Sequence, residues 1–241
     1  MNLEEIALIN AEAIQKNQYP GRGIVIGMTP DGENYVQVYW IMGRSQNSRN
    51  RIFQLEGSFV KTKAFDPAKL EDPSLIIYYP VKDIKNIHIV TNGDQTDTIY
   101  DYIKEGKSFE DALNTREFEP DAPNFTPRIS GFIDCSKDKA AYGMSILKTI
   151  YNNQELPVKS YFYYGSFIKG YGHCIHTYKE DGNPIPSFVG EPFIVKLQND
   201  IEENANYFWN LLNDENKVSL LVKYINVKDN SIKFNIINKN K

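Results

Sequence analysis

The sequence predicts an α+β protein in which helices pack outside stacked antiparallel sheets. Three observations favour this class. Short segments rich in Val, Ile, Tyr and Phe recur along the chain, separated by turns of Gly, Pro, Asn and Asp. Three or four helical patterns interrupt them. Aromatic residues make up 13% of the chain, with 16 tyrosines and 13 phenylalanines, which is typical of an aromatic-rich β core.

The chain of 241 residues is long enough for one large domain, and no internal repeat divides it, so residues 1–241 are expected to form a single domain. Its net charge of −4 disfavours a nucleic-acid-binding protein and favours a small-molecule partner. No run approaches the ~18 apolar residues of a membrane-spanning helix, and acidic residues stand where a signal peptide needs basic ones. We therefore expect a cytoplasmic protein without membrane contact. The formation of a homo-oligomer stays open.

A helical extension, residues 1–18, opens the chain. Apolar side chains at three- and four-residue spacing predict an amphipathic helix over residues 3–16, with Asn2 as its cap. A hairpin follows, because residues 23–27 and 35–42 suit strands and a Pro-Asp-Gly turn lies between them.

Four arginines gather at one end of this hairpin. Arg44, Arg49 and Arg51 belong to the basic loop, residues 44–51, and Arg22 directly precedes the first strand. A local cluster of positive charge on an acidic chain favours a bound anion.

The remaining elements follow from the same patterns. β-branched and aromatic runs bounded by turn residues predict strands over residues 52–55, 59–63, 75–79, 85–91, 129–134, 140–147, 160–164, 218–227 and 231–237. Helical spacing predicts helices over residues 98–105 (beginning at Thr96 or Asp97), 109–114 (capped by Ser108) and 200–212. Residues 117–128 carry three prolines, which favours an irregular loop.

Several familiar sites lack their signatures. The chain has no GxGxxG after a strand, no GxxxxGK[ST] and no GxSxG, so dinucleotide, NTP and α/β-hydrolase functions are disfavoured. His173, Cys174 and His176 are close in sequence, but neighbours on a strand point to opposite faces and no further ligand lies at a familiar distance. No metal site is therefore expected. His88, in an alternating apolar strand, is more typical of a core histidine than of a catalytic base.

Five segments, in this order and at these intervals, resemble the archaeal-type IMP cyclohydrolase family: YPGRGIVIG, YWIMGRSQNSRNR, IIYYPVK, VTNGDQTDTI and FEPDAPNFTPRI. The resemblance covers about residues 19–135. It implies closure of the pyrimidine ring of 5-formamidoimidazole-4-carboxamide ribotide to give IMP and water. It also implies a four-layer αββα sandwich similar to N-terminal-nucleophile hydrolases, without the processed nucleophile.

The resemblance implies that Arg49, Tyr78 and Glu119 match the family's active-site arginine, tyrosine and glutamate, and that Lys85 matches its lysine. Ring closure needs the carboxamide nitrogen to attack the formyl carbon, an oxyanion to be stabilised and protons to move, which requires no cofactor. The arginine fork suits a phosphate or the oxyanion, the phenol suits the formyl oxygen, and the carboxylate suits the carboxamide group.

Each of these residues also has a structural interpretation. Arg49 could form a surface salt bridge, and Tyr78 could be a core aromatic residue. Glu119 could be an exposed loop acid, in which case Glu117 or Asp121 would be the equivalent residue.

A substrate-binding role is expected for the turn between strand and helix that contains Asn92, Thr96, Asp97 and Thr98. Backbone amides and hydroxyls there could cradle a phosphate or a ribose, although the same residue types also serve a capping turn. Arg128, together with Arg22 and Arg44, would complete a cluster that binds the 5′-phosphate of the substrate.

Three function classes are consistent with the sequence. The first is a cyclohydrolase acting on a small purine nucleotide. The second is another amide hydrolase or cyclase on the same scaffold, and the third is a purine-nucleotide-binding protein without turnover. A pocket that contains Tyr78 and Glu119 would favour catalysis, whereas an arginine cluster alone would favour binding.

Overall fold

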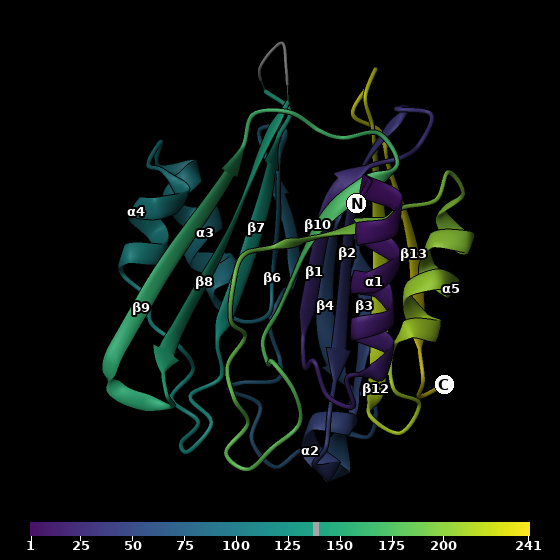
Figure 1. Cartoon of the computed structure of the whole chain (residues 1–241). Coiled ribbons are helices and arrows are strands. Elements are labelled where there is room, and N and C mark those ends of the chain that lie inside the picture. The colour runs from purple at the N-terminus through teal and green to yellow at the C-terminus, as the bar shows by residue number, and fades with distance from the viewer. Residues whose placement is uncertain (137–139) are drawn as a thin grey trace.

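The computed structural model of the chain describes residues 1–136 and 140–241. Two antiparallel sheets stack face to face within this part of the chain (Figure 1). The first has six strands, β1 (Gly23–Met28), β2 (Asn34–Met42), β10 (Tyr171–His176), β11 (Phe193–Lys196), β12 (Lys217–Asn226) and β13 (Ile232–Asn238), in the order β11-β10-β1-β2-β12-β13. The second has seven, β3 (Arg51–Glu56), β4 (Phe59–Ala64), β5 (Val81–Ile84), β6 (Ile87–Thr91), β7 (Arg128–Asp134), β8 (Ala141–Ile150) and β9 (Asn153–Tyr164), in the order of the chain.

Helices cover the outer face of each sheet (Figure 1). The six-stranded sheet packs against α1 (Leu3–Lys16) and α5 (Ile201–Leu211). The seven-stranded sheet packs against α3 (Gln95–Lys104) and α4 (Phe109–Asn114). The expected α+β class with antiparallel sheets is therefore confirmed. No helix in the described residues is both long and apolar enough to cross a membrane.

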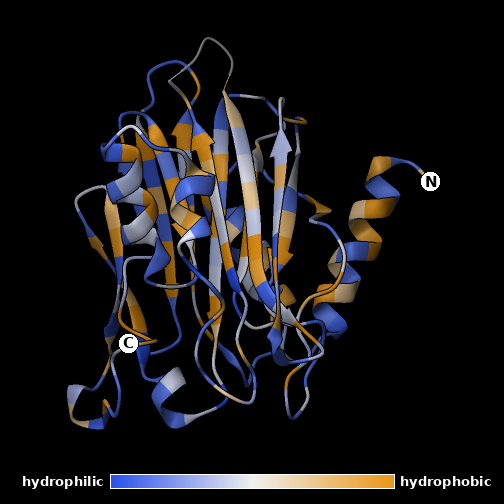
Figure 2. Ribbon diagram, turned by 90° about the vertical axis from the view of Figure 1, so that its left-hand side faces the viewer, coloured by the Kyte–Doolittle hydropathy of each residue, from blue (hydrophilic) through white to orange (hydrophobic). Residues whose placement is uncertain are grey.

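The core has three parts, which follow from the alternation of side chains along the strands. On β2, Tyr39 points into the space between the sheets, and its neighbour Trp40 points outward to Phe208 of α5. Figure 2 shows the alternation of apolar and polar residues along the strands. A third cluster joins α3 and α4 to the outer face of the seven-stranded sheet through Ile99 and Phe109.

Predictions that rest on local caps and turns are confirmed. Asn2 and Glu5 form a capping box at the start of α1, and Ser108 and Asp111 form another at the start of α4. The predicted hairpin of β1 and β2 pairs in register, as do the two last strands of the chain. The helix predicted over residues 200–212 is α5, which spans Ile201–Leu211 and has Asp200 as its N-cap.

The predicted strand over residues 75–79 is wrong. Residues 74–76 form a turn, in which Pro73 O accepts from Ile76 N at 3.1 Å. Thr62 of β4 bonds to the backbone of Tyr78: its amide donates to Tyr78 O at 2.9 Å, and its hydroxyl oxygen accepts from Tyr78 N at 2.8 Å. Besides β3, the strand that pairs with β4 is β5, which comes later and has no counterpart among the expected strands.

Positive φ angles explain two further corrections. Lys85 and Asn86 have φ of 51° and 62°, so they form the two-residue turn between β5 and β6 instead of opening the strand predicted over residues 85–91. Tyr151 and Asn152, with φ of 55° and 52°, form the equivalent turn between β8 and β9. Strand β9 therefore begins at Asn153, before the predicted start at residue 160.

Two helix boundaries also differ from expectation. The basic loop contains a short helix, α2 (Gln46–Arg49), because Ser45 and Ser48 form a capping box. Helix α3 begins at Gln95, earlier than the predicted Thr96 or Asp97. A 3₁₀ turn, η1 (Pro67–Lys69), lies in the surface connection after β4, and β11 was not expected.

Candidate functional site

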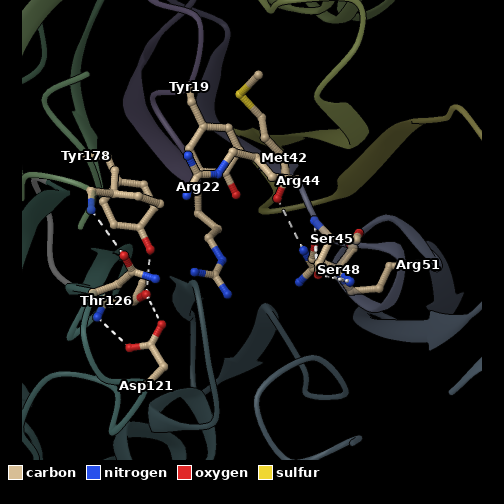
Figure 3. Close-up of a pocket in the computed structure, with 12 residues that line it drawn as sticks. Tyr19, Arg22, Met42, Arg44, Ser45, Ser48, Arg51, Asp121, Thr126 and Tyr178 are labelled. Atoms are coloured by element: carbon tan, nitrogen blue, oxygen red, sulfur yellow. Dashed lines mark hydrogen bonds between the residues drawn. The ribbon is translucent and has the colours of Figure 1, made fainter. Parts of the chain in front are cut away.

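A cavity of about 220 Å³ opens at one end of the sandwich, where β1, β3 and β7 begin and β2 and β10 end (Figure 3). It is lined by Tyr19, Arg22, Met42, Arg44, Ser45, Ser48, Arg51, Asp121, Asn124, Thr126, Tyr178 and Ile185. These residues come from segments far apart in the sequence, which the antiparallel order of the strands brings to the same end.

Two walls face each other across the cavity (Figure 3). The hydroxyl–acid wall consists of Asp121, Thr126 and Tyr178. The basic-loop wall consists of Ser45, Ser48 and Arg51. The side chain of Arg22 projects between the two walls.

Arg22 and Glu119 form a buried ion pair beside the cavity. Arg22 Nη2 lies 3.6 Å from Glu119 Oε2, and the residues are 9% and 1% exposed. Thr177 holds the backbone of Arg22, because its Oγ1 accepts from Arg22 N at 3.1 Å. Burial works against the charged guanidinium, but Glu119 and neighbouring phenols more than offset it and hold the pKa of Arg22 above its usual value.

Burial has the opposite consequence for Glu119. It raises the pKa of this carboxyl group, and the favourable charges of Arg22 and Arg128 offset the rise only in part. The backbone of Glu119 is fixed to the hydroxyl–acid wall, since its amide donates to Thr126 O at 2.9 Å. A buried carboxyl group with a raised pKa is suited to accepting a proton.

Arg51 supplies a fully buried cation to the basic-loop wall. Its Nε donates to Ser48 O at 2.7 Å and its Nη2 to Met42 O at 3.3 Å. Its Nη1 has no hydrogen-bond partner among the described residues. Burial lowers the pKa of Arg51. A buried guanidinium with a free donor beside a cavity is arranged to bind an anion.

Two tyrosines are paired next to these arginines. The hydroxyls of Tyr39 and Tyr78 are 2.7 Å apart, and both side chains are buried. Tyr78 interacts electrostatically with Arg22 and with Arg51. Tyr79 points away, because its hydroxyl donates to Glu56 at an exposed position, 2.9 Å away.

The hydroxyl–acid wall is tied together by Thr126. Its amide donates to Asp121 Oδ1 at 2.6 Å, and its hydroxyl is hydrogen-bonded both to Asp121 Oδ2 and to the hydroxyl of Tyr178. Arg44 lies at the cavity mouth. Its guanidinium carbon is 5.0 Å from the ring centre of Tyr19, and the guanidinium group forms an ion pair with Asp181.

None of the four predicted catalytic residues lines this cavity. Glu119 and Tyr78 are buried beside it, where they contact Arg22 and Tyr39, and the other two lie farther away. Arg49, at the end of α2, is exposed, and its guanidinium donates to Gly43 O at 2.9 Å and to Asn216 Oδ1 at 3.0 Å. Lys85 is exposed in the turn between β5 and β6 and lines a different cavity. The length of β6, about 16 Å for five residues, separates Lys85 from the end that carries the cavity.

The turn predicted to cradle a phosphate binds groups of the protein instead. Asn92 donates to Pro127 O at 2.8 Å, and Thr96 Oγ1 lies 2.6 Å from Thr91 Oγ1. Asp97 pairs with Lys82 at 2.6 Å. They join the turn to neighbouring strands and do not cap α3, whose N-cap residue Asp94 makes no side-chain cap hydrogen bond.

Thr98 and Arg128 also bind within the protein. Thr98 Oγ1 accepts from Arg116 at 3.3 Å. Arg128 donates to Asp94 Oδ1 at 2.6 Å and to Gln95 Oε1 at 2.8 Å, and its charge acts on Glu119 from the side of α3. Arg128 is therefore bonded to the start of α3 and does not line the cavity.

Nothing in the sequence indicated Tyr39, Thr126 or Tyr178 as parts of the site. The resemblance had offered Asp121 only as an alternative to Glu119. The alternation along β2 places Tyr39 between the sheets, but nothing local distinguishes it from the apolar residues on the same face.

The histidines bind protein groups or lie in the core. His173 Nδ1 is 2.6 Å from the hydroxyl of Tyr142, and His176 Nδ1 is 2.9 Å from Tyr178 O. His88 is buried between the sheets.

Comparison with known families matches residues 19–230 to the family described as IMP cyclohydrolase-like protein. The IMP cyclohydrolase of Methanococcus maripaludis is 36% identical over 132 residues, which cover 52% of this chain and 62% of the relative's length. That of Methanosphaera stadtmanae is 34% identical over 121 residues, covering 48% of this chain and 58% of the relative. That of Methanococcus aeolicus is 29% identical over 160 residues, covering 65% and 75%.

Proposed function

The chain belongs to the IMP cyclohydrolase-like protein family, and we propose that it closes the pyrimidine ring of 5-formamidoimidazole-4-carboxamide ribotide to give IMP and water. One observation carries this proposal. Arg22 and Arg51 line one cavity, and the buried carboxyl group of Glu119 and the tyrosine pair of Tyr39 and Tyr78 interact with them. A binding protein without turnover would need the arginines but not the buried acid or the phenols.

The phosphate of the ribotide is proposed to lie near the cavity mouth, within reach of Arg44 and Arg51. A phosphate monoester carries close to two negative charges near neutral pH, and planar guanidinium groups bind it through two parallel hydrogen bonds. The free Nη1 of Arg51 supports this placement, since a buried donor without a partner is costly unless a ligand satisfies it.

The reacting end of the base is proposed to lie beside Glu119. The carboxamide nitrogen attacks the formyl carbon, Glu119 takes a proton from that nitrogen, and Arg22 and Tyr78 stabilise the oxyanion. The water that leaves carries the formyl oxygen, one proton from the carboxamide nitrogen and one from the formamide nitrogen. The raised pKa of Glu119 supports its role, because the carboxyl group both accepts and returns a proton.

We also infer that the arrangement of helix, sheet, sheet and helix is the αββα sandwich typical of N-terminal-nucleophile hydrolases, formed by residues 1–241 as one domain. The two stacked antiparallel sheets and the helices on both outer faces support this inference. In this account Arg22 directly precedes β1, whereas Tyr78 and Glu119 come from the connections that lead to β5 and β7.

A pair of neighbouring tyrosines offers a matched test. The purified protein is mixed with the formamido ribotide, and IMP is followed by its absorbance. We expect Tyr78→Phe to slow ring closure about tenfold or more, because a donor to the oxyanion is lost. Tyr79→Phe should keep the wild-type rate, since its hydroxyl binds Glu56 at the surface. No IMP above the uncatalysed background with the wild-type protein would overturn the proposed activity.

A further inference from the structure

A group of buried polar atoms lies between the two sheets, away from the cavity. It comprises Gln37 Oε1 of β2, Asp83 Oδ1 of β5, both ring nitrogens of His88 of β6, and Lys223 Nζ of β12. None of these atoms has a hydrogen-bond partner among the described residues. We call these four residues the inter-sheet polar site.

The four side chains converge from both sheets. Lys223 and Gln37 are opposite each other in the register of the six-stranded sheet, and Asp83 and His88 are opposite each other in the seven-stranded sheet. The two pairs face across the core, because Lys223 Nζ lies 3.7 Å from Asp83 Oδ1 and Gln37 Nε2 donates to His88 O at 2.9 Å.

Burial makes this arrangement costly unless further partners are present. Lys223 and Gln37 are 0% exposed and His88 is 3% exposed. An ammonium group has three donors, but Lys223 Nζ makes no hydrogen bond among the described residues: the carboxylate of Asp83 is 3.7 Å away and the ring centre of Phe234 is 5.6 Å away. A buried charge without hydrogen bonds is strongly disfavoured, and buried polar groups in native proteins are bonded to protein or to ordered water.

We propose that ordered water occupies the inter-sheet polar site and bridges Lys223 and His88 to Asp83 and Gln37. The chemistry of the site favours water over an ion. The ammonium group of Lys223 repels a metal cation, and the carboxylate of Asp83 repels an anion, whereas water donates to the two oxygens and accepts from the amino group. The side chain of Asp83 is 24% exposed, so the site reaches solvent at this edge.

The charge states of the site agree with this assignment. Burial lowers the pKa of His88 to about 3, so that its ring is neutral near pH 7 and offers one donor and one acceptor. Burial also lowers the pKa of Lys223 to about 8, while Asp83 opposes the change, so the amino group is largely charged near pH 7. Cys135 is a further titratable group that acts on Lys223, and burial raises the pKa of its thiol to about 11.

The consequence is a water-mediated polar link across a largely apolar core. Gln37 and Lys223 belong to one sheet and Asp83 and His88 to the other, so bridging water connects the two sheets at this point. Water-mediated hydrogen bonds are nearly as favourable as direct ones, so the link also holds the two sheets in a fixed relation.

A crystal structure of the full chain, at a resolution that shows ordered water, tests the proposal directly. We expect a water peak within hydrogen-bond distance of Lys223 Nζ and of a His88 ring nitrogen. Lys223 donating directly to Asp83 and Gln37, with no density between the side chains, would overturn it. So would an anomalous peak at the site after a bromide soak, because that would identify an anion.

A variant adds an independent comparison. In crystals of Lys223→Met we expect the peak next to position 223 to disappear, whereas Lys233→Met, at an exposed position of β13, should leave it in place. A peak that persists unchanged in Lys223→Met would contradict the role of the amino group. If Lys223→Met does not fold, the wild-type crystal structure decides the question alone.

Discussion

Replacing Arg51 with methionine is expected to weaken the binding of IMP, and replacing Arg49 with methionine is expected to leave it nearly unchanged. Arg51 is buried at the cavity with a free Nη1, whereas Arg49 is exposed and binds Gly43 and Asn216. A hydrogen bond to a charged group contributes roughly 1.5–3 kcal/mol. The dissociation constant for IMP should therefore rise about 10- to 150-fold in Arg51→Met and less than about twofold in Arg49→Met.

Isothermal titration calorimetry with IMP measures both variants. Because Arg51 also donates to Ser48 O and Met42 O, its loss leaves two carbonyls without these bonds, and the melting temperature of each variant has to be measured first. Titrations are then made well below the lower melting temperature. Arg51→Lys is a useful third variant, since it keeps the charge but loses the fork, and it should lie between the wild type and Arg51→Met. An equal loss of affinity in Arg49→Met and Arg51→Met would refute the reasoning.

Three further predictions concern packing and titration. A Cβ atom at Gly23 would lie 1.9 Å from the ring of Trp40, so Gly23→Ala should lower the free energy of unfolding by about 3 kcal/mol or more in urea titrations. Gly165 has open space around it, so Gly165→Ala should change this free energy by less than about 0.5 kcal/mol. The pKa of Lys223 is lowered from 10.5 to about 8, so between these pH values the unfolded chain binds more protons than the folded chain. The free energy of unfolding should therefore rise with pH across this window, by roughly 3 kcal/mol relative to Lys223→Met. Parallel plots of unfolding free energy against pH for the two proteins would contradict this. Burial raises the pKa of Glu119, so the loss of IMP formation on acidification should have its midpoint at a higher pH than an ordinary glutamate would give. A midpoint at the pKa of an ordinary glutamate would count against this carboxyl group as the base.

Features encoded within a few residues were predictable from the sequence. The capping boxes of α1 and α4 and the turn between β1 and β2 depend on side chains that bond to their own neighbourhood. The helix α2 inside the basic loop belongs to the same class, because Ser45 and Ser48 stand at capping-box spacing. This spacing places Arg49 at the end of a helix, whereas Arg51 begins the strand that follows.

Features that depend on distant partners were not predictable. The apolar run at residues 75–79 resembles a strand, but Thr62 takes up the backbone groups around Tyr78 that a ladder would use. Periodicity describes one segment at a time and contains no information about such a partner.

The candidate site shows the same division. The sequence indicated that four arginines, Arg22, Arg44, Arg49 and Arg51, would gather at one end of the first hairpin, and the structure brings all of them except Arg49 to the cavity. The burial of Glu119 could not be inferred, because it depends on Arg22 and on Thr126 meeting it in three dimensions. A proline-rich sequence predicts an exposed loop, and only the three-dimensional contacts of the loop show that one of its residues is buried.

We propose that the buried carboxyl group of Glu119 takes part in ring closure, and a comparison with the neighbouring acid Glu117 tests this most directly. IMP formation from the formamido ribotide is measured for the wild type, Glu119→Gln and Glu117→Gln, after their melting temperatures have been compared. Glu117 is exposed, so its variant should keep the wild-type rate, while loss of the proton acceptor should slow Glu119→Gln by about 10²- to 10⁴-fold. A wild-type rate in a folded Glu119→Gln protein would contradict the account.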